Sequence, residues 1–188
     1  MNAKLILIIA FSFLYGAFEV FMNLRQGKSS ISNSGDRGSL RLLYLSISAG
    51  YFLAFTTASF KIGRIYHWNA LFLTGLLLAL VGLVIRIGSI KTLRHYFTYS
   101  VSKIAHQELV TTGFYRYIRH PGYLGQLLIF LGLGTSLSNW ISILCLMVPV
   151  LIAYLYRINV EEEFMVLHMG SEYTRYQERT KKLIPGIY

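Results

Sequence analysis

The sequence predicts an all-α integral membrane protein with five transmembrane helices, the last two of which form a helical hairpin. Three observations support this fold class. Hydrophobic residues make up 54% of the 188 residues and charged residues only 14%, an apolar content higher than a soluble core needs. Long apolar runs recur along the chain, and basic residues gather between them on alternate sides. We expect residues 1–188 to form a single membrane-embedded domain.

Three apolar runs occupy the N-terminal half. Residues 5–22 form the first run, which has the look of a signal peptide. No small-residue cleavage site follows it and Glu19 interrupts its end, so we interpret it as a retained span. Residues 40–60 and 68–90 form the next two, each bordered by basic residues and carrying Tyr or Trp at an end. Each run approaches the roughly 20 residues that cross a membrane, so residues 1–90 are expected to be a three-helix membrane part.

The last apolar block, residues 124–156, is too long for one span. Ser138, Asn139 and Trp140 near its middle supply turn-forming polarity and an aromatic ring suited to the membrane interface. The block therefore predicts two antiparallel helices joined by a tight turn. Residues 91–188 then comprise a loop, this hairpin and a C-terminal tail.

The distribution of lysine and arginine predicts the orientation, because cytoplasmic loops collect positive charge. Fifteen of the eighteen basic residues lie in the first loop, in the third loop with its flanks, or in the tail. The N-terminus is therefore expected outside and the C-terminus in the cytoplasm. The exceptions are Lys4, Lys61 and Arg64.

The net charge of +10 also raises the question of a nucleic-acid partner. These cations border apolar spans and do not form a groove-reading helix, so we expect anionic membrane lipids, and no nucleic acid, as their counter-charge. The single cysteine, Cys145, excludes an internal disulfide. His95, His106 and His168 show no metal-ligand spacing, and no metal site is predicted.

The loops differ in what they predict. The first loop, "NLRQGKSSISNSGDRGS" at residues 23–39, is rich in Gly and Ser and is expected to be a flexible connector without chemistry. Residues 91–122 and the tail from Arg157 onward contain most of the polar side chains that could bind a ligand or take part in catalysis. The two helices of a hairpin begin and end at the same membrane face. We therefore expect Arg119 and His120 to lie close to residues 157–163.

The motif "RHPGYLG" at residues 119–125 predicts where a helix begins. Pro121 suits the first turn because its missing N–H would have no intrahelical partner there, and it disfavours helical geometry at His120. A helix N-terminus beside an imidazole and the Arg119 guanidinium is expected to attract an anion. Arg86, near the end of its span, is expected only to extend its charge toward the membrane surface.

The second motif, "RINVEEEF" at residues 157–164, places Arg157 and Glu161 four residues apart on one helical face. Glu162 and Glu163 follow, so the three carboxylates surround the helix. At least one of them is expected to face the third loop, where it could accept hydrogen bonds from an ammonium group or from ribose hydroxyls. Their alternative role is that of a solvated helical face.

Together these motifs resemble the isoprenylcysteine carboxyl methyltransferase family, in its small prokaryotic type. The resemblance rests on "LVTTGFYRYIRHPGYLG" at residues 109–125, "RINVEE" at 157–162 and "GSEYTRYQERTKKLIPGI" at 170–187. It extends weakly to "RIGSIKTLRHYFT" at residues 86–98, and it matches the first two spans only as apolar segments. The pairing of the two motifs across an apolar hairpin is far more specific than either motif alone.

The resemblance implies an enzyme that transfers a methyl group from S-adenosylmethionine to the carboxylate of a lipid-linked acceptor, with S-adenosylhomocysteine as product. It also implies a cytoplasmic cofactor-binding loop, in the plasma membrane of a prokaryote or the endoplasmic reticulum of a eukaryote. Catalytic roles fall on Arg157, Glu161 and Glu162, with Arg157 gripping the acceptor carboxylate. The implied cofactor-binding residues are Gln107, Glu108, Leu109, Val110, Tyr115, His120, Pro121, Gly122, Tyr123 and Glu161.

Two other functions stay open at this point. A phospholipid N-methyltransferase would share the C-terminal motifs, but its amine acceptor must lose a proton during the reaction. A glutamate would then serve as base, and Arg157 would be an awkward neighbour for a cationic substrate. The remaining alternative is a small membrane scaffold whose polar loop binds a protein partner or lipid headgroups.

Overall fold

The computed structural model describes residues 3–25, 35–60, 62–66, 68–101 and 108–188. Over these residues the chain is helical, with isolated bridges but no strand. The predicted all-α fold is therefore confirmed for the described part of the chain. The helices are α1 (Ala3–Arg25), α2 (Ser39–Ala58), α3 (Trp68–Leu93), η1 (Arg94–Tyr96), η2 (Gly113–Arg116), α4 (Pro121–Ser136), α5 (Trp140–Met169) and α6 (Ser171–Arg179).

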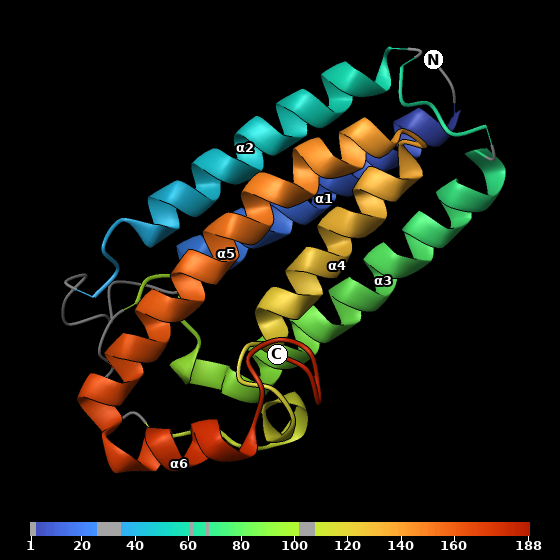
Figure 1. Cartoon of the computed structure of the whole chain (residues 1–188). Helices are drawn as coiled ribbons and strands as arrows, with labels where there is room; N and C mark the ends of the chain where they lie inside the picture. The colour runs from blue at the N-terminus through green and yellow to red at the C-terminus, as the bar shows by residue number, and fades with distance from the viewer. Residues whose placement is uncertain (1–2, 26–34, 61, 67, 102–107) are drawn as a thin grey trace.

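The five long helices run roughly along one direction, and α6 crosses one end of them (Figure 1). Helix α3 packs against α4, and α2 packs against α5. The start of α1 and the turn between α4 and α5 lie at one end of the bundle, whereas α6 and the C-terminus lie at the other. Each loop that carries sequence motifs therefore reaches the same end of the molecule.

Four helical stretches in the described residues are long and apolar enough to cross a membrane. By this measure the structure supports four of the five expected spans. Helix α4 has 16 residues, which corresponds to about 24 Å, short of a hydrocarbon layer about 30 Å thick. The four stretches are Ala3–Arg25, Ser39–Ala58, Asn69–Tyr96 and Trp140–Met169.

The predicted hairpin turn is confirmed, because α4 ends at Ser136 and α5 begins at Trp140. Asn139 caps α5: its side-chain oxygen accepts hydrogen bonds from the backbone amides of Ile141 (2.9 Å) and Ser142 (3.3 Å). Its amide nitrogen donates to the carbonyl oxygen of Thr57 (3.2 Å), in the last turn of α2, and to that of Ile62 (3.0 Å), just beyond α2. This buried side chain therefore fixes the hairpin to the neighbouring helix.

Small residues bring α3 and α4 into close contact. A Cβ atom added at Gly132 would lie 2.4 Å from the carbonyl oxygen of Gly75 and 2.6 Å from the amide nitrogen of Ala79. One at Gly82 would lie 2.5 Å from the carbonyl oxygen of Gly125. Close backbone approach at small residues is the usual basis of helix packing in membranes. It sets α4, and with it the His-Pro motif, against α3.

We predict that Gly132→Leu lowers the thermal unfolding temperature in detergent by about 5–10 °C, because overpacking forces the two helices apart. Gly16→Ala is the matched control, since nothing lies within 4 Å of a Cβ atom added there. The measurement is a melting curve followed by circular dichroism or tryptophan fluorescence. Equal melting temperatures for the Gly132 variant and the control would contradict this packing.

Candidate functional site

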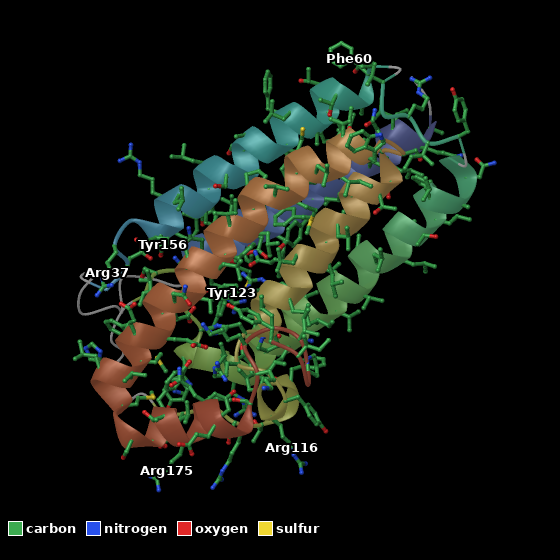
Figure 2. The ribbon with its side chains drawn as sticks, in the orientation of Figure 1. Arg37, Phe60, Arg116, Tyr123, Tyr156 and Arg175 are labelled. Carbon is green, nitrogen blue, oxygen red and sulfur yellow. The ribbon has the colours of Figure 1, made fainter. Side chains whose placement is uncertain are left out.

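A cavity of about 430 Å³ opens in the half of the bundle that carries α6. Its walls come from α1, α2, the end of α3, α4 and α5, from η1 and η2 with the segments beside them, and from α6. Tyr123, near the start of α4, lies in this half between α4 and α5 (Figure 2). Arg157 and Glu161 line the cavity beside Tyr123 in the first turn of α4, which we call the charged end. Leu43, Ile47 and Phe130 line it further along α2 and α4, which we call the apolar end.

Most of the predicted site residues line this cavity. Pro121 does not; it is fully buried as the first residue of α4. Gln107 lies outside the described residues, and Glu162 faces a separate outer groove with Gln177 and Lys182. The predicted residues that line the cavity are Glu108, Leu109, Val110, Tyr115, His120, Gly122, Tyr123, Arg157 and Glu161.

The His-Pro motif begins a helix as expected. His120 has non-helical backbone angles (φ −122°, ψ 54°), and α4 starts at Pro121. The carbonyl oxygen of His120 accepts hydrogen bonds from the amides of Tyr123 and Leu124, both at 3.1 Å. The anion beside this N-terminus belongs to the chain itself, because the Glu162 carboxylate lies 3.0 Å from Nε2 of His120. An anion therefore lies beside Arg119 and His120 as expected, and binding of a ligand anion at this position stays a prediction.

Glu162 is the centre of a buried polar cluster. Its Oε1 accepts from Nε of Arg119 at 2.7 Å and lies against His120, and its Oε2 accepts from Nε2 of Gln177 at 3.1 Å. The ammonium group of Lys182 lies 3.7 Å from Oε2. All these groups hold the end of α5 against residues 119–120 and the tail, so Glu162 joins the two motifs structurally and its predicted catalytic role finds no support in its position.

Glu161 has the opposite orientation and faces the cavity. Its Oε2 accepts from the hydroxyl of Tyr123 at 2.7 Å, and that hydroxyl accepts from Nε of Arg157 at 3.0 Å. The imidazole of His120 stacks on the Tyr123 ring, with centroids 5.5 Å apart. The side chain of Glu161 is one-third exposed, which leaves carboxylate surface available to a ligand. Residues from α4 and α5 thus form one connected wall.

Arg157 is held by more partners than the sequence analysis expected. Its Nη1 donates to Oδ1 of Asp36 and to Oγ of Ser39, both at 2.9 Å, and its Nη2 donates to the carbonyl oxygen of Tyr99. With the bond to Tyr123, these contacts occupy four of the five guanidinium N–H groups. Arg157 can therefore grip a ligand carboxylate through two N–H groups only when one of these partners leaves.

Asp36 also corrects the prediction that the first loop has no chemical part. Its Oδ2 accepts from the amide of Leu40 at 3.1 Å, so the carboxylate caps α2 while it binds Arg157. Burial favours the neutral acid, but the Leu40 amide and the Arg157 guanidinium outweigh it and hold the pKa of Asp36 below its usual value. The carboxylate is thus ionised at neutral pH and supports Arg157 from outside the cavity.

Comparison with known proteins identifies this arrangement. The family model described as phospholipid methyltransferase matches residues 70–172, just over half of the chain. The chain belongs to the phospholipid methyltransferase family. The match contains α4, the hairpin turn, α5 and both motifs, so it includes the walls of the cavity that α4 and α5 supply.

Among individual proteins, this family member is similar to isoprenylcysteine O-methyltransferases, and the predicted resemblance is confirmed. Protein-S-isoprenylcysteine O-methyltransferase A of Arabidopsis thaliana is 36% identical over 116 residues, which cover 60% of this chain and 58% of that protein. The Schizosaccharomyces pombe protein-S-isoprenylcysteine O-methyltransferase is 35% identical over 79 residues, 42% of this chain and 34% of that protein. The chain thus matches well under two thirds of the length of these relatives.

A solved structure supports the same relationship. The eukaryotic intramembrane Ras methyltransferase ICMT superposes with a TM-score of 0.57 and 26% sequence identity. The superposition covers 77% of this chain and 52% of that chain. The arrangement of most of the helices is therefore shared with that isoprenylcysteine carboxyl methyltransferase.

The buried ion pair between Arg86 and Glu19 was not predicted from the sequence. Arg86 is 3% exposed, and its Nε and Nη2 donate to the two carboxylate oxygens of Glu19 at 2.9 and 2.8 Å. The hydroxyls of Tyr15 (2.8 Å) and Tyr99 (2.6 Å) donate to the same carboxylate. The expectation that Arg86 only reaches the membrane surface is wrong. The pair could have been predicted, because Glu19 and Arg86 carry opposite charges within two apolar runs and charged residues inside membrane spans usually pair.

We predict that Glu162→Ala lowers the thermal unfolding temperature by about 10 °C, because it leaves Arg119 buried without its carboxylate. Glu163→Ala is the matched control: Glu163 pairs with Arg37 at 2.6 Å, but both side chains are more than 60% exposed. An exposed pair contributes little, so this control should melt within about 2 °C of the wild type. Similar melting temperatures for both variants would rule out a structural role specific to Glu162.

Proposed function

We propose that the protein is an S-adenosylmethionine-dependent methyltransferase that methylates the carboxylate of a lipid-linked, isoprenylcysteine-like acceptor at the cytoplasmic face of a membrane. One observation carries the proposal: a single cavity joins a charged end, with Glu161 and Arg157, to an apolar interior between membrane helices. A charged donor and a lipid-tailed acceptor need such a junction to meet. The similarity to isoprenylcysteine O-methyltransferases supports the same acceptor class.

We also propose that the end carrying α6 faces the cytoplasm, that the N-terminus lies outside, and that α4 is a fifth membrane-embedded helix. The excess of lysine and arginine in the loops and tail at the α6 end supports this orientation. The packing of α4 between α3 and α5 supports its place within the membrane part, although it is shorter than the other spans.

The cavity fits the proposed methyl donor in size and charge. Its volume of about 430 Å³ lies within the range of small-molecule sites. S-adenosylmethionine supplies a methyl group bound to a positively charged sulfur, and the Glu108 and Glu161 carboxylates in the wall suit its positive charges. Together with Glu108 and Glu161, the residues that would hold the donor are Leu109, Val110, Tyr115, His120, Gly122 and Tyr123.

For an acceptor carboxylate, positioning is the main task of the protein. A carboxylate is already ionised at neutral pH, so no strong general base is required and orientation within the cavity controls the rate. Arg157 supplies a fixed positive charge and one N–H group beyond its four described bonds. Tyr123 links Arg157 to Glu161 and so sets the spacing between the acceptor end and the donor end of the site.

A second candidate, phospholipid N-methylation, is favoured by the description of the matching family. An amine acceptor would have to give up a proton, and Glu161 would be the base in the cavity wall. The Tyr123 hydroxyl that donates to Glu161 also accepts a hydrogen bond from the Arg157 guanidinium. A cationic headgroup bound at Glu161 would therefore lie close to a second positive charge. We therefore place the carboxylate acceptor first.

The two candidates differ in a simple chemical property of the product. Purified protein in lipid vesicles is given S-adenosylmethionine with a radiolabelled methyl group and N-acetyl-S-farnesylcysteine. We expect labelled product that alkali hydrolyses to volatile methanol, because methyl esters are base-labile. Alkali-stable label, formed instead on phosphatidylethanolamine, would replace the proposal with N-methylation. Absence of S-adenosylmethionine binding by calorimetry would contradict both reactions and favour the membrane scaffold.

Arg157→Ala is expected to lower kcat/KM for methyl transfer by about 100-fold or more, because it removes a preorganised positive group from the acceptor end. Its affinity for S-adenosylhomocysteine should change little. Arg37→Ala is the control, since the Arg37 side chain is exposed and pairs with the equally exposed Glu163. Unchanged turnover of Arg157→Ala in a detergent assay would remove Arg157 from the mechanism.

A further inference from the structure

Tyr99 links the wall of the cavity to an ion pair between two of the membrane helices. Its hydroxyl donates to Oε2 of Glu19 at 2.6 Å, and the same carboxylate accepts two hydrogen bonds from the guanidinium of Arg86. Arg86 lies in α3 and is buried, and its guanidinium carbon is 5.7 Å from the centroid of the Tyr99 ring. The side chain of Tyr99 is therefore held by a buried pair of opposite charges.

The backbone around Tyr99 depends on such side-chain contacts. Residues 97–101 form neither helix nor strand, so no regular ladder of backbone hydrogen bonds sets their position. The ring of Phe97 packs against that of Tyr99, with centroids 5.1 Å apart, and the guanidinium carbon of Arg86 lies 5.2 Å from the Phe97 centroid. The ion pair thus anchors this segment through two aromatic rings.

The carbonyl oxygen of Tyr99 in turn contacts Arg157, because it accepts a hydrogen bond from Nη2 of that residue. The two N–H groups of Nη1 bind Asp36 and Ser39, neither of which lines the cavity. The Nε–H group binds Tyr123. A guanidinium has five N–H groups, so these contacts leave the second N–H of Nη2 for a ligand. The Tyr99 carbonyl therefore orients the nitrogen that carries this remaining N–H.

We propose that Tyr99 is a positioning residue for methyl transfer: the Glu19–Arg86 ion pair fixes its hydroxyl, and its carbonyl thereby directs Arg157 toward the acceptor carboxylate. The inference rests on the proposed function, which places that carboxylate at Arg157. A displacement of about 1 Å in a reacting group can lower a rate by about 100-fold, so a small shift of residues 97–101 affects catalysis. Because Tyr99 acts through Arg157, its effect should disappear when Arg157 is removed.

The test removes the Tyr99 hydroxyl alone and measures methylation of N-acetyl-S-farnesylcysteine in lipid vesicles. Tyr99→Phe keeps the ring and the carbonyl. We expect its kcat to fall about tenfold, while its affinity for S-adenosylhomocysteine, measured by calorimetry, stays within about twofold of the wild type. In an Arg157→Ala background, the same change should lower the remaining kcat by less than about twofold, because the group through which Tyr99 acts is absent.

Tyr117→Phe is the matched control. Tyr117 is 62% exposed and does not line the cavity, so the loss of its hydroxyl should leave kcat unchanged. If the wild type does not methylate the farnesyl acceptor, the proposed function fails and this inference fails with it. If the wild type is active, an unchanged kcat for Tyr99→Phe overturns the inference alone. An equal fractional loss with and without Arg157 also overturns it, since a merely structural role would lower both activities alike.

Glu19→Gln provides a second variant. It is measured if Tyr99→Phe does not bind S-adenosylhomocysteine as the wild type does. The neutral amide keeps the size of the side chain but weakens the hydrogen bonds from Tyr99 and Arg86, because hydrogen bonds to a charged group are stronger. The same fall in kcat, confined to the protein that retains Arg157, is then required, and its absence overturns the inference.

Discussion

The arrangement of the site depends on the buried charge of Arg119. A guanidinium enclosed between the start of α4, α5 and the tail needs a carboxylate, because an unpaired buried charge is strongly destabilising. Glu162 supplies it at 2.7 Å and also binds His120, Gln177 and Lys182. Since successive residues of a helix point in directions about 100° apart, fixing Glu162 toward this cluster turns Glu161 toward the cavity. A structural ion pair thereby orients the carboxylate beside it.

A second consequence is that the cavity is assembled from segments far apart in the chain. Arg157 of α5 is bonded to Asp36 before α2, to Tyr99 before η2 and to Tyr123 of α4. Glu19 of α1 binds Arg86 of α3 and the hydroxyl of Tyr99, so residue Tyr99 connects the two charged centres through its backbone and its side chain. Ordering of the polar end therefore depends on correct packing of all the membrane helices.

The fold and the motif contacts were predictable because their signals are local. Apolar runs indicate spans, Asn139 indicates the hairpin turn, and a hairpin necessarily brings His120 near the glutamates of α5. The length of α4 was less predictable, because Pro121 and the cap at Asn139 leave it only 16 residues. The bonds of Arg157 to Asp36, 121 positions away, and of Glu19 to Arg86 were not predicted. Such pairs depend on which helices become neighbours, and no spacing in the sequence records that.

The central claim is that the two motif-bearing segments jointly enclose the methyl donor at the charged end of the cavity. The most direct measurement is an experimental structure, by crystallography or electron cryomicroscopy, with S-adenosylhomocysteine bound. We predict density for the ligand between Gly122 and Glu161, with its sulfur directed toward the Arg157 side of the cavity. Ligand density in the outer groove beside Glu162 and Gln177, or density that contacts neither α4 nor α5, would contradict it.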